Sequence, residues 1–211
     1  EIRIPLTDTA VTIVVNANGP GFFRVEYSAD LLLRITGSTL SSLDTLERYN
    51  LVDDAWNAVV AGAMSSDAYI AFLQGFTDER DLAVWQTIAA SLKSLSRIVP
   101  TESEPAFASL VKALVTPALA HFGWKPVAGE EDLVAKLRGL IVQLLAIHGK
   151  DTDAQRQCRD ILFNNTVTEP ELVAAATNVV AATGDATDYE WFLGRYRDPS
   201  TPQEQIRMLY A

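Results

Sequence analysis

Histidines are the residues in this sequence that most readily suggest chemistry, because protein metal sites commonly use them. The sequence has two, His121 and His148, and neither belongs to an H-E-x-x-H motif or stands near a C-x-x-C pair. A zinc site would need both histidines and several carboxylates brought together by the fold. Each histidine precedes a glycine at an expected helix end, where the helix dipole favours it. We therefore assign no metal ligand.

A nucleophilic site would need an activated hydroxyl or thiol. The single cysteine, Cys158, shares an expected helix face with Ile161 and Leu162, where cysteine commonly serves as a small buried apolar residue. The sequence contains no G-x-S-x-G nucleophile motif and no basic motif that would activate a thiol. These patterns predict no covalent catalysis.

Three pairs of adjacent acidic residues are candidates for acid–base chemistry: Asp53-Asp54, Asp78-Glu79 and Glu130-Glu131. Neighbours on a helix point about 100° apart, so the members of a pair do not share a site. The second and third pairs fall at expected helix starts, where negative charge is favoured anyway. We predict no catalytic, cofactor-binding or metal-binding residue, which disfavours an enzyme complete within 211 residues.

Two further patterns have structural explanations. Residues 18–21, Asn-Gly-Pro-Gly, superficially resemble a phosphate-binding loop, but they join two expected strands and no helix follows to receive a phosphate. We interpret them as a turn. The tryptophans are spread along the chain and fit packing between helices better than a stacking platform; they are Trp56, Trp85, Trp124 and Trp191.

Composition predicts a folded acidic protein. Hydrophobic residues make up 48% of the chain, and the net charge is -10. That charge argues against nucleic acid and against an anionic membrane surface as partners. No uncharged apolar run approaches the roughly 20 residues that span a bilayer, and the first residues do not look like a signal peptide. A single cysteine favours a reducing cytoplasm.

The first 27 residues have a strand-like pattern. Residues 11–16 are rich in β-branched side chains, and residues 22–27 alternate large apolar with polar groups on the far side of the turn. Three strands at most cannot form a stable domain by themselves. We expect the segment 11–27 to pair with another part of the protein, or with a second copy of the chain through its exposed strand edges.

Helical periodicity begins at Ser28 and continues to the end of the sequence. The apolar stripes and caps predict roughly ten short helices joined by polar turns. No strict repeat is visible. We expect a mainly α fold, a superhelix of stacked antiparallel hairpins similar to HEAT or armadillo arrays, preceded by a few β-strands. The last expected helix has no cap or polar tail, which favours an array that continues further.

Several segments resemble the C-terminal part of the zinc aminopeptidase N family, which includes the puromycin-sensitive type. Residues 14–27 resemble the family's signature at the end of its small β-sandwich domain, and residues 47–56 resemble the opening of its helical domain. The remaining similar positions are Phe122-Gly123-Trp124, Gly129-Glu130, Leu137-Arg138 and the region 188–210.

The resemblance implies that residues 1–27 end a β-sandwich domain and that residues 28–211 form a helical domain, truncated at its C-terminus. In the family, the zinc ligands and the general base lie in an earlier peptidase domain that is missing here, so no catalytic residue is carried over. The helical domain closes over that active site and binds peptide substrates on its concave face. The implied partners are therefore the peptidase and β-sandwich domains, with zinc held only in the former.

A stand-alone helical scaffold for protein–protein interaction is the alternative, because stacked hairpins also form extended grooves. A scaffold should begin with a helix and be capped at both ends. The strand-like start and the uncapped last helix favour the aminopeptidase domain.

Overall fold

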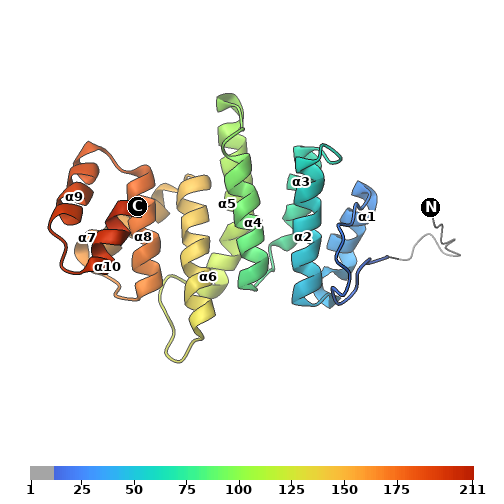
Figure 1. The fold of residues 1–211 in the computed structure, drawn as a ribbon, viewed down its shortest axis with the longest axis horizontal. Coiled ribbons are helices and arrows are strands. Elements are labelled where there is room, and N and C mark those ends of the chain that lie inside the picture. The colour runs from blue at the N-terminus through green and yellow to red at the C-terminus, as the bar shows by residue number, and fades with distance from the viewer. Residues whose placement is uncertain (1–11) are drawn as a thin grey trace, which may run out of the picture. The chain divides into compact units, whose positions relative to one another are not determined.

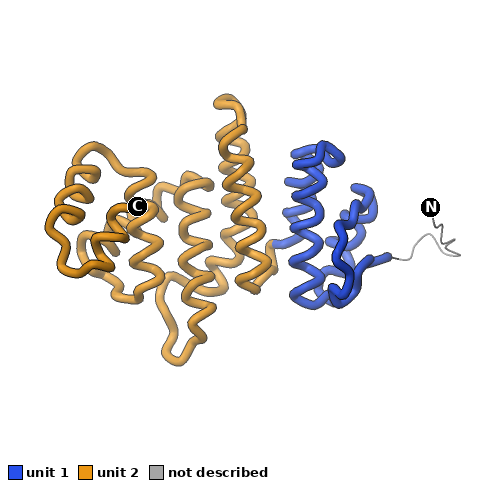
Figure 2. Tube along the Cα trace, viewed as in Figure 1, with its two compact units in different colours: residues 1–76 blue, residues 77–211 orange. Residues whose placement is uncertain are grey.

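The computed structural model describes residues 12–211, and their regular structure is helical, with no β-strand in that range (Figure 1). The mainly α fold is confirmed. The α-helices are α1 (Ala29–Arg34), α2 (Thr45–Val60), α3 (Ser66–Leu73), α4 (Leu82–Leu95), α5 (Glu104–Phe122), α6 (Asp132–Gln143), α7 (Thr152–Asn164), α8 (Pro170–Thr183), α9 (Ala186–Arg197) and α10 (Pro202–Tyr210). The chain divides into two compact units, Glu1–Phe76 and Thr77–Ala211 (Figure 2).

Helix α2 of the first unit is longer than the sequence predicted. In the sequence, Ser41 or Ser42 is a possible N-cap for one helix, and the apolar spacing from Leu51 predicts another, but a single helix runs from Thr45 to Val60. Its N-cap is Asp44, whose side chain accepts from the backbone of Glu47, while the Glu47 side chain accepts from the backbone of Asp44. This reciprocal capping satisfies backbone donors that an earlier start would leave unpaired.

The strands predicted within residues 11–27 are not confirmed; residue 11 lies outside the described range, and residues 12–27 contain no strand. A strand needs the backbone of a partner, and here side chains take that place. Asn16 donates to the carbonyl of Gly21 and accepts from its amide, at 3.0 and 2.7 Å. The hydroxyl of Tyr27 accepts from the amide of Val15.

The same segment is attached to α2 by polar contacts. The guanidinium of Arg24 pairs with Asp53 and lies 3.4 Å from a carboxylate oxygen of Asp54. The amide of Asn18 donates to Glu47 at 3.1 Å. Burial raises the pKa of Asp54, and the hydrogen bond from Arg24 opposes that change. The first acidic pair is therefore an anchor for the segment that precedes the helices.

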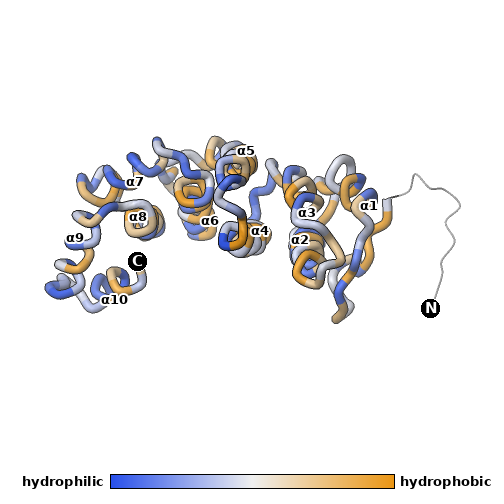
Figure 3. The backbone as a smooth tube through the Cα atoms, turned by 90° about the horizontal axis from the view of Figure 1, so that it is seen from above, coloured by the Kyte–Doolittle hydropathy of each residue, from blue (hydrophilic) through white to orange (hydrophobic). Residues whose placement is uncertain are grey.

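The second unit is built from neighbouring helix pairs, with α6 against α8, α7 against α8, and α9 against α10. Apolar positions recur along these helices (Figure 3). Gly139 permits the close approach of α6 and α8, since a Cβ at that position would lie 3.1 Å from the carbonyl oxygen of Glu171. The superhelical repeat that we predicted is not confirmed.

Helix α5 is continuous through Pro117, although a proline inside a helix usually kinks or breaks it. Because proline has no backbone N–H, Pro117 removes one hydrogen bond of the helix. The packing of the surrounding side chains keeps the segment helical. With its leading turn, the segment Thr101–Phe122 is long and apolar enough to cross a membrane by length and composition alone. Its apolar character also has a structural use, because Phe107, Val111 and Leu114 are buried in the core.

A buried arginine joins α5, α6 and the loop between them. Arg138 is 1% exposed, and its guanidinium donates to both carboxylate oxygens of Glu130 at 2.7 and 2.6 Å. It also donates to the carbonyls of Gly123 and Phe122, at 3.0 and 3.3 Å. The hydrogen bonds from Arg138 lower the pKa of Glu130 to about 2. Three of the segments that resemble the aminopeptidase family, Phe122-Gly123-Trp124, Gly129-Glu130 and Leu137-Arg138, thus meet at one guanidinium.

Replacing Arg138 should destabilise the second unit severely. Arg138→Met leaves the Glu130 carboxylate and two carbonyls without their donor, and removal of one partner of a buried pair costs about 3–5 kcal/mol. Lys136→Met, on the exposed side of the same helix, removes the same charge and should change the free energy of unfolding by less than about 0.5 kcal/mol. Urea unfolding of both variants makes the comparison. Equal losses would contradict the structural role assigned to Arg138.

Candidate functional site

The two histidines lie on different elements. His121 is exposed near the end of α5, with its ring edge-on to that of Phe122 at 4.9 Å. His148 ends the π-helical turn Leu144–His148 that follows α6, where burial and the charge of Lys93 lower its pKa. Among residues 12–211, no three His, Cys, Asp or Glu side chains are grouped so that they could hold a metal ion.

Cys158 is fully buried on α7. Burial raises the pKa of its thiol to about 12. At neutral pH the residue is therefore a thiol and a poor nucleophile, because the thiolate is the reactive form. This geometry agrees with the interpretation of Cys158 as a core residue.

The second acidic pair lies in the turn that precedes α4, whose N-cap is Asp81. Glu79 is 5% exposed, and its carboxylate accepts from the amides of Arg80 and Asp81, both at 2.8 Å. Its backbone carbonyl accepts from the indole of Trp85, which is buried in the core. Asp78 lies beside the guanidinium of Arg80. These carboxylates support local structure and are not directed at a shared reaction site.

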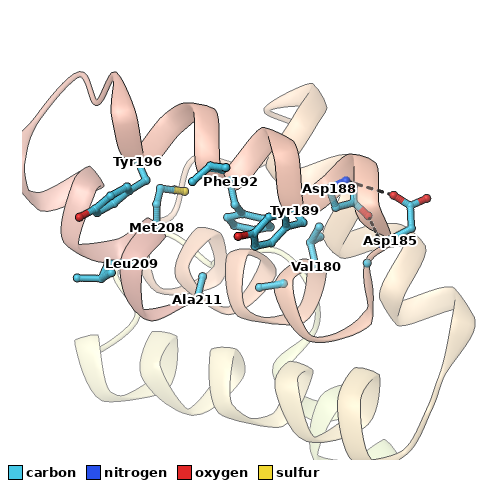
Figure 4. A pocket seen from close by; sticks show the side chains of 12 residues that line it. Val180, Asp185, Asp188, Tyr189, Phe192, Tyr196, Met208, Leu209 and Ala211 are labelled. Carbon is cyan, nitrogen blue, oxygen red and sulfur yellow. Dashed lines mark hydrogen bonds between the residues drawn. The ribbon is translucent and has the colours of Figure 1, made fainter.

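A concavity with a volume of about 530 Å³ lies between α8, α9 and α10 (Figure 4). Its walls are mainly apolar and aromatic, with two aspartates at one end. The lining residues are Val180, Ala181, Gly184, Asp185, Asp188, Tyr189, Phe192, Leu193, Tyr196, Met208, Leu209 and Ala211. Apolar walls with a few polar groups are typical of ligand pockets. The sequence did not predict this pocket, because its residues come from three separate helices.

An ion pair fixes the end of the pocket at which α9 begins. Asp188 is buried and accepts from both terminal nitrogens of Arg159, on α7, at 2.5 and 2.8 Å. Its carboxylate also accepts from the amide of Asp185, the N-cap of α9. The hydrogen bond from Arg159 is the main cause that lowers the pKa of Asp188. Asp188 is therefore charged and occupied, and it is unsuited to act as a general base.

Aromatic contacts and a second ion pair also hold together the helices that form the pocket. The ring of Trp191 stands edge-on to Phe163 of α7, with ring centroids 5.0 Å apart. Arg195 of α9 pairs with Glu204 of α10. The side chain of Gln205 donates to the carbonyl of Tyr196 at 3.1 Å. The pocket is thus a supported apolar surface that can receive apolar side chains, with no activated acid, base or nucleophile at its wall.

Packed helices around a largely apolar pocket, with most of the reactive residue types used in packing, ion pairs and backbone contacts, define a helical domain. A family model described as the ERAP1-like C-terminal domain matches residues 12–211. This chain belongs to that family.

Known relatives include aminopeptidases. Aminopeptidase M1 of Arabidopsis thaliana is 26% identical over 97% of this chain and 25% of its own length. Tricorn protease-interacting factor F2 of Thermoplasma acidophilum is 30% identical over 81% of this chain and 21% of its own length. Aminopeptidase N of Plutella xylostella is 22% identical over 100% of this chain and 23% of its own length. The resemblance to the C-terminal part of the zinc aminopeptidases is confirmed, and the chain spans about a quarter of these relatives.

Weakening the Arg159–Asp188 pair should destabilise the helices around the pocket. Asp188→Asn keeps the size of the side chain but removes its charge. We expect a loss of roughly 1.5–3 kcal/mol in the free energy of unfolding, toward the lower end because Arg159 is partly exposed. Urea unfolding followed by tryptophan fluorescence provides the measurement. Glu190→Gln, an exposed site on the same helix, is the control, and an equal loss there would refute the assignment.

Proposed function

We propose that this chain is the non-catalytic helical C-terminal domain of a zinc metallo-aminopeptidase, and that it closes over the active site and controls which peptides enter and bind. The family match over residues 12–211 carries this proposal. The aminopeptidase relatives are about four times as long as the chain, which leaves room for a separate catalytic domain. We also propose a cytoplasmic location, since the one cysteine is unpaired and buried.

Zinc has no suitable site within residues 12–211, because no group of three metal-binding side chains lies together there. The metal would therefore be held by a peptidase domain outside this chain. The part assigned to this chain is to shape the space around that site. The apolar pocket between α8, α9 and α10 supports this role, because a peptide presents apolar side chains that such walls can bind.

Exposed aromatic residues support contact with a neighbouring domain. Phe22 and Phe23 follow the turn at residues 18–21 with exposures of 109% and 57%, and Val15 is 42% exposed. Large apolar groups that gather on one exposed segment are typical of an interaction surface. We assign this segment to the junction with the β-sandwich domain, and we propose that residues 1–27 end that domain.

The encoding gene provides the direct test of the proposed function. The region upstream of Glu1 should encode an H-E-x-x-H motif followed by a more distant glutamate. The full-length protein should then hydrolyse an aminoacyl-anilide in a zinc-dependent manner, whereas the 211-residue chain should not, with or without added zinc. Absence of the upstream motif, or hydrolysis by the purified short chain, would reject the proposal and would favour a stand-alone scaffold or an unrecognised enzyme.

Without its neighbour, the isolated chain should self-associate through residues 11–27. Sedimentation velocity over a dilution series should show a dimer that dissociates as the concentration falls. The double variant Phe22→Ser, Phe23→Ser should remain monomeric, because it removes the exposed apolar area that drives association. Leu133→Ser, an equally exposed apolar site in the second unit, is the control and should still dimerise. A wild-type chain that stays monomeric at every concentration would exclude this surface.

A further inference from the structure

Asn18 differs from the other asparagines in its neighbour and in its surroundings. It is the only asparagine in the sequence that is followed by glycine. Its side chain is exposed, and within the part of the chain that the structure describes its side-chain amide has no hydrogen-bond partner. By contrast, the side-chain amide of Asn16 donates to the carbonyl of Gly21 at 3.0 Å. The side chain of Asn18 can therefore rotate toward the peptide group that follows it.

An asparagine followed by glycine can lose ammonia without an enzyme. The backbone nitrogen of Gly19, after giving its proton to hydroxide, attacks Cγ of Asn18 and forms a new C–N bond. The side-chain nitrogen leaves as ammonia, and the product is a succinimide ring. Water then opens the ring at either carbonyl, which gives an aspartate or an isoaspartate with no oxidation or reduction. Glycine favours ring closure because it has no Cβ that would crowd the attacking nitrogen.

The turn at residues 16–21 holds the attacking nitrogen. The amide of Gly19 donates to the carbonyl of Asn16 at 2.8 Å. The Asn16 side chain also donates to the carbonyl of Gly21 and accepts from its amide, so three hydrogen bonds close the turn. The nitrogen of Gly19 can attack only after its own bond opens. The reaction should therefore proceed from an open turn, and it should be slower in the folded chain than in an unfolded one.

Both products are poorly matched to the closed turn. The backbone amide of Asn18 donates to the carboxylate of Glu47 on α2 at 3.1 Å, so a carboxylate at position 18 places a second negative charge close to the first. An isoaspartate also lengthens the backbone by one carbon, which displaces Gly19 from Asn16. A Cβ at Gly19 would lie 2.6 Å from a side-chain carbon of Leu46, so the turn has little room to shift toward α2. A turn that has reacted should therefore not close again in the same way.

We propose that Asn18 is a site of spontaneous deamidation, and that its products release the turn at residues 16–21 from α2. The reaction needs only water, and the ion pair of Arg24 with Asp53 still holds the end of the segment. Because the turn belongs to the proposed junction with a preceding domain, the modification would loosen that junction as the protein ages. The site lies within the first unit and does not depend on the proposed function.

Mass spectrometry of the aged chain provides the first test. After incubation in mildly alkaline buffer, peptides that contain position 18 should show the mass of the acid in place of the amide, with isoaspartate as a separate chromatographic peak. Asn165 is the internal control, because it is exposed and has a similar backbone, with φ 51° against 61° for Asn18, but is followed by Thr166. It should remain an amide. Conversion that is absent at Asn18, or equal at both asparagines, would overturn the proposal.

A comparison of folded and unfolded chains tests the role of the turn. Conversion of Asn18 should be roughly tenfold faster in guanidinium chloride, because one hydrogen bond of ordinary net strength then no longer holds the nitrogen of Gly19. Asn18→Gln should abolish the conversion in both states, since a glutamine would have to close a larger ring. Equal rates in the two states would contradict a reaction that depends on opening of the turn.

Hydrogen exchange followed by NMR tests the release. Asn18→Asp supplies the aspartate product in a uniform sample, and the amides of Gly19 and Gly21 should exchange roughly tenfold faster in it, as expected for the loss of about one net hydrogen bond. Asn165→Asp, which makes the same charge change in the second unit, is the control and should leave these amides unchanged.

The purified isoaspartate form separates the two causes of release. Faster exchange in both products assigns the release to the new charge, and faster exchange in the isoaspartate form alone assigns it to the longer backbone. Unchanged exchange of the Gly19 and Gly21 amides in both products would reject the release of the turn.

Discussion

The burial of Arg138 is the constraint on which the second unit most depends. A guanidinium that is 1% exposed must have its donors satisfied within the protein, because an unpaired buried charge would be strongly destabilising. Glu130 supplies two acceptors, and the end of α5 supplies two more. The end of one helix, the following loop and the next helix are therefore held in one arrangement, and the helices that pack on α6 inherit its position.

The same need to provide partners for buried polar groups explains why reactive residue types do not form a reaction site within the described part of the chain. Asp54 and Asp188 pair with guanidinium groups, Glu79 accepts from backbone amides in the turn before α4, and Cys158 is a buried thiol. For Asp188, the hydrogen bonds from Arg159 lower the affinity for protons and make the carboxylate a weak general base. These residues hold neighbouring segments together, which suits a domain whose proposed part is to shape the surroundings of chemistry performed elsewhere.

Sequence periodicity predicted most of the helices because each buries a single apolar stripe against its neighbours. It failed where the outcome depended on distant partners. Residues 12–27 have strand-like alternation, yet the side chains of Asn16 and Tyr27 take the backbone bonds that a partner strand would supply. The role of Arg138 was also missed, although a charged residue within the apolar stripe of α6 was a signal. The apolar pocket was not predictable, since periodicity within one helix does not say which helices meet.

A stacked helical unit has no single central core, so polar contacts recur at successive junctions. Arg138 joins α5 to α6, Arg159 joins α7 to α9, and Arg195 joins α9 to α10. Arg138 is 1% exposed, whereas Arg159 and Arg195 are 45% and 44% exposed, and solvent screens an exposed pair. The pair at the α5–α6 junction should therefore contribute more to stability than either of the other two. The apolar pocket lies beside the two less buried pairs, between α8, α9 and α10.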